Sequence, residues 1–353
     1  MTLSIINQAI APVLSMSFSA CEMDPPLTVA HATGIYSLAQ QPTTMGITWN
    51  SGDSGPSATD AALEGLQEHS IILTMNRIAL VRLCGAALFL LGSWAAYTQN
   101  PPAGQLTVNK VKDGLYEIAG DGGNVAVYIT GEGVIMIDDK FEQDYASIVE
   151  KVKSITTQPV AYIINTHHHA DHSGGNVKFA PTVEIISTAN ARANIVEKKQ
   201  PGAPARVTFS DETSVFLGGM EVRAKYFGRG HTDGDAVIYF PALKTIHTGD
   251  LMAGTSPSID YLGGGSLIEW TKTLDGAMTL DFDTVIPGHG NVTDKAGLMT
   301  YRNNVEKLRT RAQGLIRSGK SQEEVGKVLQ MEFGWTPANQ ITWSLPGMMT
   351  ELR

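Results

Sequence analysis

Four of the nine histidines of this chain lie close together, in the sequence HHHADH that begins at His167. This sequence comes shortly after a continuous apolar run, Val160–Ile164, which has the length of a buried strand. On an extended segment His167 and His169 point the same way, so both imidazoles can reach one metal ion. Asp171 and His172 come after a further turn and can face a second ion nearby. Imidazole and carboxylate groups suit zinc, and imidazole also suits iron or nickel; a solvated histidine-rich loop is the alternative interpretation.

Three other segments of similar character follow predicted strands. They supply His231, Asp250 and His289 as further candidate ligands, within the sequences GHTDGD, HTGD and PGHG. Each places glycine near the candidate ligand, and glycine lets the backbone turn sharply and approach an ion closely. Four segments of this kind disfavour a purely structural histidine loop and predict a metal site at the ends of strands.

Together these motifs resemble the metallo-β-lactamase superfamily, whose signature is an HxHxDH loop followed by later His, Asp and His ligands. The resemblance covers about residues 106–312. It implies an α/β (α+β) fold, a four-layer αββα sandwich with its site at one edge between two sheets. It also implies a first metal bound by His167, His169 and His231, a second bound by Asp171, His172 and His289, and Asp250 bridging both.

Such a site predicts hydrolysis. Two zinc ions are expected, with iron or manganese as alternatives. Cations about 3.5–4 Å apart would stabilise the attacking and leaving oxygens and lower the pKa of bound water to roughly 7. We therefore expect an exported dinuclear zinc hydrolase whose metal-bridging hydroxide opens an ester, lactone or β-lactam-type carbonyl bond. Asp171 is the predicted catalytic residue, because it can orient the hydroxide or move its proton.

The residue at position 250 separates branches of the superfamily. Asp250 stands where β-lactamases with a mixed histidine–cysteine site have cysteine, and where the other dinuclear β-lactamases have serine. It resembles the bridging aspartate of type-two glyoxalases, acyl-homoserine lactonases, transfer-RNA-processing nucleases and alkylsulfatases. This weakens, without removing, the interpretation as an antibiotic hydrolase. Thioesters, phosphate esters and sulfate esters stay open as substrates, and a metal-fold oxidoreductase or a non-hydrolytic binding factor stays open as a function.

Other polar residues are predicted to support the ligands. Asp138 or its neighbour Asp139 ends a strand that points toward the same edge. Asp233 and Asp235 could hold the far nitrogens of ligand histidines or simply cap their loop. His247 is expected to support a ligand or lie in the core.

Two further expectations concern residues around the site. His168, the middle residue of the HxH pair, is expected to point away from the metals as a structural histidine. The triplet Gly263–Gly265, with Tyr261 and Trp270, is a candidate for a mobile lip over the site. An ordinary loop, with Trp270 on the core face of a helix, is the alternative.

The elements that must position these residues alternate in type. The predicted strands are Leu106–Val111, Leu115–Ile118, Val125–Thr130, Val134–Asp138, Val160–Ile164, Val183–Ser187, Thr213–Leu217, Met220–Tyr226, Ala236–Phe240, Thr245–His247 and Thr284–Pro287. The predicted helices are Tyr145–Ile155, Ala191–Lys199, Ile268–Leu280, Lys295–Ile316 and one that begins at Ser321 with a capping box. Strands followed by helices, twice over, predict mixed sheets covered by helices.

The N-terminal part of the chain reads differently. Residues 1–74 contain six acidic residues and no Lys or Arg, and we expect a non-native or disordered extension. Residues 75–95 have a basic start, an apolar run and small residues at Ser93 and Ala95, as in a signal peptide. The alternative for this stretch is a membrane anchor. Residues 96–105 would then be a linker, and 106–353 a metallo-β-lactamase-fold domain with a helical C-terminal tail.

Composition narrows the partners. The formal charge is −9 and the folded part has no long basic run, so no nucleic-acid partner is expected. Both cysteines, Cys21 and Cys84, precede the folded part, which therefore holds neither a disulfide nor a thiolate site. We expect a small-molecule substrate and a periplasmic or secreted protein if Met75 is the true start. Otherwise the protein would be membrane-anchored, and the sequence gives no oligomeric state.

Overall fold

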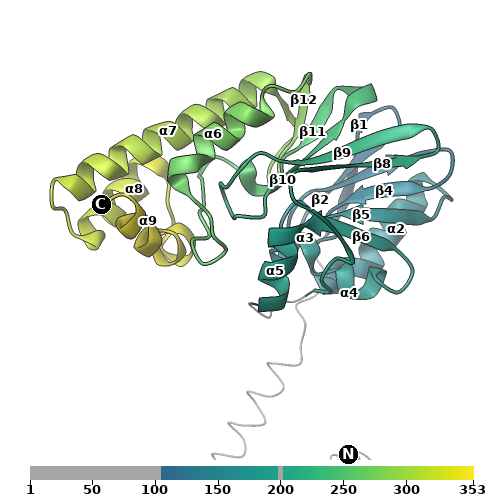
Figure 1. Ribbon diagram of the computed structural model, residues 1–353, viewed down its shortest axis with the longest axis horizontal. Coiled ribbons are helices and arrows are strands. Elements are labelled where there is room, and N and C mark those ends of the chain that lie inside the picture. The colour runs from purple at the N-terminus through teal and green to yellow at the C-terminus, as the bar shows by residue number, and fades with distance from the viewer. Residues whose placement is uncertain (1–104, 198–201) are drawn as a thin grey trace, which may run out of the picture. The chain divides into compact units, whose positions relative to one another are not determined.

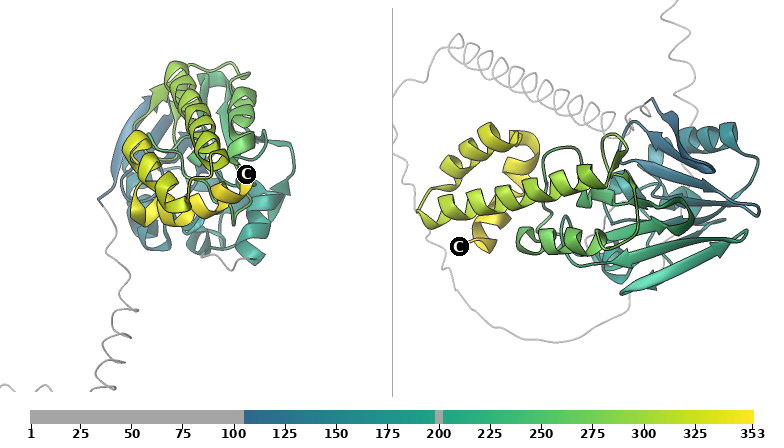
Figure 2. Two further views of the ribbon diagram at one scale, coloured as in Figure 1. Left: turned by 90° about the vertical axis from the view of Figure 1, so that its left-hand side faces the viewer. Right: turned by 90° about the horizontal axis from the view of Figure 1, so that it is seen from above.

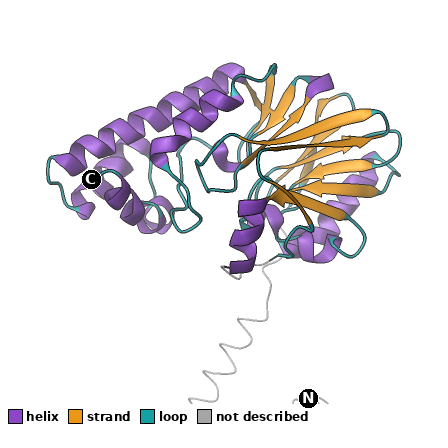
Figure 3. Cartoon of the chain, in the orientation of Figure 1, coloured by secondary structure: helices purple, strands orange, loops and turns teal. Residues whose placement is uncertain are grey.

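The computed structural model describes residues 105–197 and 202–353, whose backbone forms two packed sheets (Figures 1 and 3). The first sheet has the order β1 (Thr107–Lys112), β2 (Leu115–Ala119), β3 (Val125–Ile129), β4 (Val134–Ile137), β5 (Val160–Ile164), β6 (Glu184–Thr188), β7 (Val207–Phe209). The second has the order β13 (Thr293–Asp294), β12 (Thr284–Ile286), β11 (Thr245–His247), β10 (Ala236–Phe240), β9 (Met220–Tyr226), β8 (Glu212–Leu217). Strands β4 to β7 run parallel, as do β11 and β12, so each sheet gathers several strand C-termini at one edge.

Helices cover the outer faces of both sheets. The α-helices of the described residues are α2 (Tyr145–Ile155), α3 (Ala170–Ser173), α4 (Asn176–Phe179), α5 (Ala189–Glu197), α6 (Leu267–Ala277), α7 (Lys295–Arg317), α8 (Gln322–Phe333) and α9 (Leu345–Glu351). Shorter turns of helix occupy Glu142–Asp144, Pro241–Leu243 and Gly249–Leu251, and a π-helix occupies Pro337–Ile341.

Alternation along the strands explains the layers, because successive strand residues face opposite sides of a sheet. In β5, Ile164 packs between the two sheets and Ile163 packs against α2. In β10, Ile238 packs between the sheets and Val237 faces the cluster that contains α6 and α7. The fold is therefore the four-layer αββα sandwich that the sequence predicts.

The C-terminal tail folds back on the same helices. In Figures 1 and 2, α8 and α9 lie beside α7 at the yellow end of the chain. Trp335, Leu345 and Met348 are buried in one cluster with residues of α6 and α7. The capping box predicted at Ser321 is present, since its hydroxyl accepts from Glu324 N and Glu324 accepts from Ser321 N.

Most predicted elements occur where the sequence places them. Val160–Ile164 and Ala236–Phe240 coincide with β5 and β10 at both ends. The short elements β7, β13, α3, α4 and α9 were not predicted, because elements of two to seven residues carry too little periodicity. The predicted extension, leader and linker, residues 1–105, lie almost wholly outside the described residues. Among those described, no helix has the length and apolarity needed to cross a membrane.

Candidate metal centre

Three histidine nitrogens converge at the edge where β5 and β9 end. His167 Nε2 lies 3.1 Å from His169 Nδ1, and His231 Nε2 lies 2.9 Å from the same atom. His167 and His169 follow β5, whereas His231 follows β9 of the other sheet. The first predicted triad is thus brought together from both sheets.

The second predicted group lies beside it. His172, on the short helix α3, points Nε2 to within 3.3 Å of Nε2 of His289, which follows β12. Asp171 Oδ2 lies 3.1 Å from His289 Nε2 and 3.6 Å from His172 Nε2. These three side chains form a compact second cluster.

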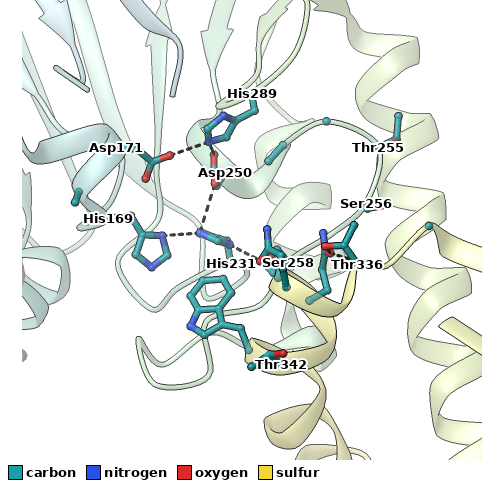
Figure 4. Close-up of a pocket in the computed structure, with 18 residues that line it drawn as sticks. His169, Asp171, His231, Asp250, Thr255, Ser256, Ser258, His289, Thr336 and Thr342 are labelled. Carbon is teal, nitrogen blue, oxygen red and sulfur yellow. Dashed lines mark hydrogen bonds and ion pairs between the residues drawn. The ribbon is translucent and has the colours of Figure 1, made fainter. Parts of the chain in front are cut away.

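Asp250 lies between the two clusters, and Figure 4 shows its contacts toward His289 and His231. Its Oδ1 lies 3.2 Å from His172 Nε2 and 3.5 Å from His289 Nε2. Its Oδ2 faces the first cluster, 3.6 Å from His231 Nε2. One carboxylate therefore presents one oxygen to each group of ligands.

The hydrogen bonds of the first triad leave lone pairs facing one another. His231 Nδ1 donates to Ser258 O (2.6 Å), and His169 Nε2 lies 3.0 Å from the Asp260 carboxylate. Thr166 Oγ1 donates to Asp138 and so can accept from His167 Nδ1 at 3.0 Å. The other nitrogen of each ring then carries no proton. Three lone pairs about 3 Å apart repel unless a cation lies between them, and tetrahedral zinc sets its nitrogen ligands at a similar spacing, about 3.3 Å.

The electrostatics of the cluster also suit cations. Burial, with the neighbouring imidazoles, lowers the pKa of His167 well below its ordinary value. Burial likewise lowers the pKa of His231 to about 4, with Asp250 opposing the shift. Burial alone would raise the pKa of Asp171, but His172 and His289 bring it down to about 2. At neutral pH His167 and His231 are therefore neutral imidazoles and Asp171 is an ionised carboxylate, which are the ligand forms that metals require.

His172 shows most directly that positive charge is favoured here. Burial lowers its pKa, but Asp171, Asp250 and Asp138 together raise it well above the ordinary value. A buried ring among three carboxylates is thus stabilised as a cation. A metal ion supplies that positive charge when the ring is a neutral ligand.

Asp138 orients the second cluster. Its Oδ2 lies 2.8 Å from His172 Nδ1, and its oxygens accept from Thr166 N and Oγ1, both at 2.7 Å. Asp138 has φ 61°, the left-handed region that residues with a Cβ rarely adopt. This conformation turns the chain at the end of β4 so that the carboxylate faces the ligands.

The other predicted supporting residues take different partners. Asp235 accepts from Thr232 N (2.9 Å) and Oγ1 (2.5 Å), so it caps the loop, and Asp233 accepts from Asn194 Nδ2. His247 is fully buried, donates from Nε2 to Asn124 O and accepts from Gly249 N beside Asp250. Its place is the core under the site.

Asp260 was missed by the sequence reasoning. Its Oδ2 lies 3.0 Å from His169 Nε2 and 3.5 Å from Nε2 of the buried His168, while Gly263 N donates to its Oδ1. These contacts hold the pKa of Asp260 well below its ordinary value, although burial opposes the shift. A lone aspartate 91 residues from its partner leaves no spacing signal in the sequence.

The site opens into a cavity of about 880 Å³, one wall of which comes from the tail. Trp343 has its ring centroid 5.4 Å from that of His169 and 6.0 Å from that of His231. The predicted lip is wrong for Trp270, which is fully buried and donates from Nε1 to Leu251 O, and Tyr261 is bound to Glu351 of α9.

Imidazole and carboxylate clusters at the edge of an αββα sandwich define a metal-dependent hydrolase. Residues 118–289 match the model of the metallo-beta-lactamase superfamily, and this region of the chain belongs to that superfamily. It is similar to the metallo-beta-lactamase IND-1 of Chryseobacterium indologenes, with 27% identity over 170 residues, 47% of this chain and 71% of that protein. It is also similar to the 2,4-dinitroanisole O-demethylase subunit alpha of a Nocardioides strain, with 27% identity over 190 residues, 52% of this chain and 57% of that protein.

Solved structures show the same fold. The metallo-beta-lactamase DIM-1 superposes with a TM-score of 0.52 at 22% identity, covering 59% of this chain and 99% of its own. A metallo-beta-lactamase from Pontibacter korlensis superposes with a TM-score of 0.52 at 21% identity, covering 57% and 99%. The tail that carries Trp343 lies beyond the residues that the family model matches.

Proposed function

We propose that this chain is an exported dinuclear zinc hydrolase that opens an ester, lactone or β-lactam-type carbonyl bond. The observation that carries the proposal is the position of Asp250, with one oxygen toward each group of ligands. A site for a single ion would not need a carboxylate shared in this way. His167, His169 and His231 would hold one zinc ion, and Asp171, His172 and His289 the other.

The two ions would supply Lewis acidity and make water acidic enough to react at neutral pH. We assign proton transfer to Asp171, and the assignment is supported by its ionised carboxylate at the cavity wall, with Oδ2 beside His289 Nε2. In the reaction the oxygen of water bonds to the carbonyl carbon, and the bond from that carbon to the leaving oxygen or nitrogen breaks. Asp171 accepts the proton from water and returns it to the leaving atom.

The test is metal content and hydrolysis by the purified full chain. The substrates are a chromogenic cephalosporin, a homoserine lactone, a thioester and an aryl ester, each with a chelated control. We expect two zinc ions per chain and turnover of one class that chelation abolishes and zinc restores. Two bound metals with no turnover across the panel would contradict this proposal and favour phosphate esters, sulfate esters or redox chemistry.

Substitution of Asp250 tests the shared carboxylate. Asp250→Ala should lose the second zinc ion and the activity together, whereas Asp113→Ala, which removes an exposed carboxylate, should keep both. Two bound zinc ions and full activity in Asp250→Ala would remove Asp250 from the mechanism. Metal content measured by mass spectrometry separates loss of the second zinc ion from unfolding, which would release both ions.

Export is supported by the basic start, apolar run and small residues of 75–95. Expression of the full chain in a bacterium that exports proteins should give a periplasmic product whose first residue follows Ala95. N-terminal sequencing measures this directly. A product that keeps Met1 would contradict the proposed export.

A further inference from the structure

Apart from the candidate metal ligands, the described residues that line the cavity carry no charged side chain. Two stretches, 253–258 and 334–343, supply the rest of the lining, and neither contains Asp, Glu, Lys or Arg. Their polar groups are hydroxyls and amides, including those of Thr255, Thr336 and Asn339. Among the described residues that line the cavity, none is Lys or Arg.

Two basic side chains on nearby loops of the described residues are engaged elsewhere. Lys140 is fully buried and donates from Nζ to Asp121 O (2.8 Å) and Gly123 O (2.6 Å). Arg229 donates from Nε to Glu269 Oε1 of α6 at 3.1 Å. The Lys140 ammonium and the Arg229 guanidinium are therefore not directed at a molecule bound in the cavity.

Trp343 gives the cavity an apolar surface next to the first histidine triad. The side chain is 36% exposed, although it is one of the largest apolar groups in the tail. Its ring contacts those of His169 and His231 on one side, and it lines the cavity on another. An indole in this position can pack against the apolar part of a bound molecule.

The tail wall is held in place against the site. Ser344, the residue directly after Trp343, accepts at Oγ from Ile259 N at 2.9 Å. Phe333, the residue directly before this wall, accepts at its carbonyl oxygen from Ser256 Oγ at 2.6 Å. Because both ends of the segment are bonded to the loop that carries Ser258 and Asp260, the indole has a fixed position relative to the ligands.

We propose that the substrate of this site is an uncharged ester or lactone whose apolar part lies on the indole of Trp343; this rests on the proposed hydrolase function. A substrate anion away from the reacting carbonyl would lose hydration here without gaining a cationic partner, which is unfavourable. Penicillins and cephalosporins carry such a carboxylate, and phosphate and sulfate esters carry charge on the ester itself. The cavity therefore favours neutral esters and lactones over these classes.

Two aryl esters that differ only in charge test the substrate class. They are p-nitrophenyl butyrate and the same ester with a sulfonate, a weak zinc ligand, in place of the terminal methyl group. For the zinc-loaded full chain we expect kcat/KM at least about tenfold higher for the neutral ester, after correction for the rate with hydroxide alone. Equal or better turnover of the sulfonate ester would overturn the proposal.

Variants of the wall test the residues. Trp343→Ala should raise KM for the butyrate ester about tenfold with little change in kcat, and Trp343→Phe should recover most of the loss. Phe216→Ala removes an aromatic side chain that is 69% exposed on β8, outside the cavity, and is the matched control. An unchanged KM in Trp343→Ala would remove Trp343 from substrate binding.

A gain of activity provides a test that misfolding cannot mimic. Asn339→Lys places a cation in the wall and should raise kcat/KM for the sulfonate ester about fivefold, with little effect on the neutral ester. If Asn339→Lys gives no selective gain for the sulfonate ester, the view that the missing cation excludes anions is contradicted.

Binding of ketones separates failure of this inference from failure of the proposed function. The ketones are analogues of the two esters in which a methylene group stands in place of the ester oxygen. Their binding to the chain is measured by titration calorimetry. If the zinc-loaded chain hydrolyses neither ester, ester hydrolysis fails as a function. The neutral ketone should still bind about tenfold more tightly than the sulfonate ketone, and tighter binding of the sulfonate ketone would overturn the inference.

Discussion

At the scale of single residues, the groups that hydrogen-bond to the candidate ligands affect how tightly those ligands bind zinc. Asp260 accepts from the far nitrogen of His169. Asp260→Asn keeps the shape but removes the negative charge that makes the imidazole a better electron donor, so zinc affinity should fall about 10- to 100-fold. Competition with a chromogenic chelator measures this. Asp233→Asn, which changes a carboxylate bonded to Asn194, should keep the affinity, and an equal loss in both variants would contradict the role of Asp260.

A second residue-scale prediction concerns Asp235, whose pKa burial raises to about 8. In the unfolded chain the pKa of this group is about 4. Between these values the folded protein binds more protons than the unfolded chain, so the free energy of unfolding falls as pH rises, by at most about 1.4 kcal/mol per pH unit. Asp235→Asn has no such proton and should show a shallower decline. Urea unfolding at about pH 5 and about pH 8 measures the slopes, and Asp281→Asn, at an exposed site, is the control.

The candidate ligands could be proposed from the sequence because their spacing is local or follows predicted strands. HxHxDH places four candidate ligands, three His and one Asp, within six residues, and His231, Asp250 and His289 each come after a recognisable apolar run. Asp260 and Trp343 could not be found in this way. Their partner in the fold, His169, is 91 residues from Asp260 and still further from Trp343, so only tertiary structure brings them together.

At the scale of elements, one carboxylate near the end of the chain joins the tail to the site. Glu351 of α9 accepts from Tyr261 Oη (2.8 Å), Ser266 Oγ (2.5 Å) and Leu267 N (3.0 Å), at the N-terminus of α6. Glu351→Gln should lower the free energy of unfolding by about 2–3 kcal/mol, because charged hydrogen bonds and a favourable helix-dipole contact are lost. Urea unfolding measures the change.

The matched control for Glu351 is a surface glutamate on another helix. Glu323→Gln removes an exposed ion pair with Lys327 in α8, and it should change the free energy of unfolding by less than about 0.5 kcal/mol. A similar small effect in Glu351→Gln would show that the tail is held by its apolar residues alone.

The elements also show where prediction from the sequence ends. β10 alternates between two buried faces and α7 runs 23 residues with a clear apolar face, so each was recognised. The π-helix Pro337–Ile341 is short and has no charged residue, and its flanking residues Phe333 and Ser344 are held by hydrogen bonds from Ser256 and Ile259. No period within the segment could indicate that wall of the cavity.

At the scale of the described part of the chain, the metal centre joins the two sheets. His167, His169 and His172 follow the first sheet, while His231, Asp250 and His289 follow strands of the second. Metal bound by both groups therefore stabilises the folded state over the unfolded chain, which lacks the assembled site. Without metal, nitrogen lone pairs of the first triad face one another with no cation between them.

Removal of zinc should consequently lower the thermal stability of the full chain. With free zinc about 1,000-fold above its Kd, the loss is about 4 kcal/mol, which corresponds to a Tm lower by about 10 °C for a folded part of this size. Scanning calorimetry before chelation, after chelation and after zinc is restored measures the change. The double variant His167→Ala/His169→Ala, which lacks two of the first triad's ligands, should respond less to chelation. Equal Tm values for the zinc-loaded and chelated wild type would mean that the ligands do not join the sheets through metal.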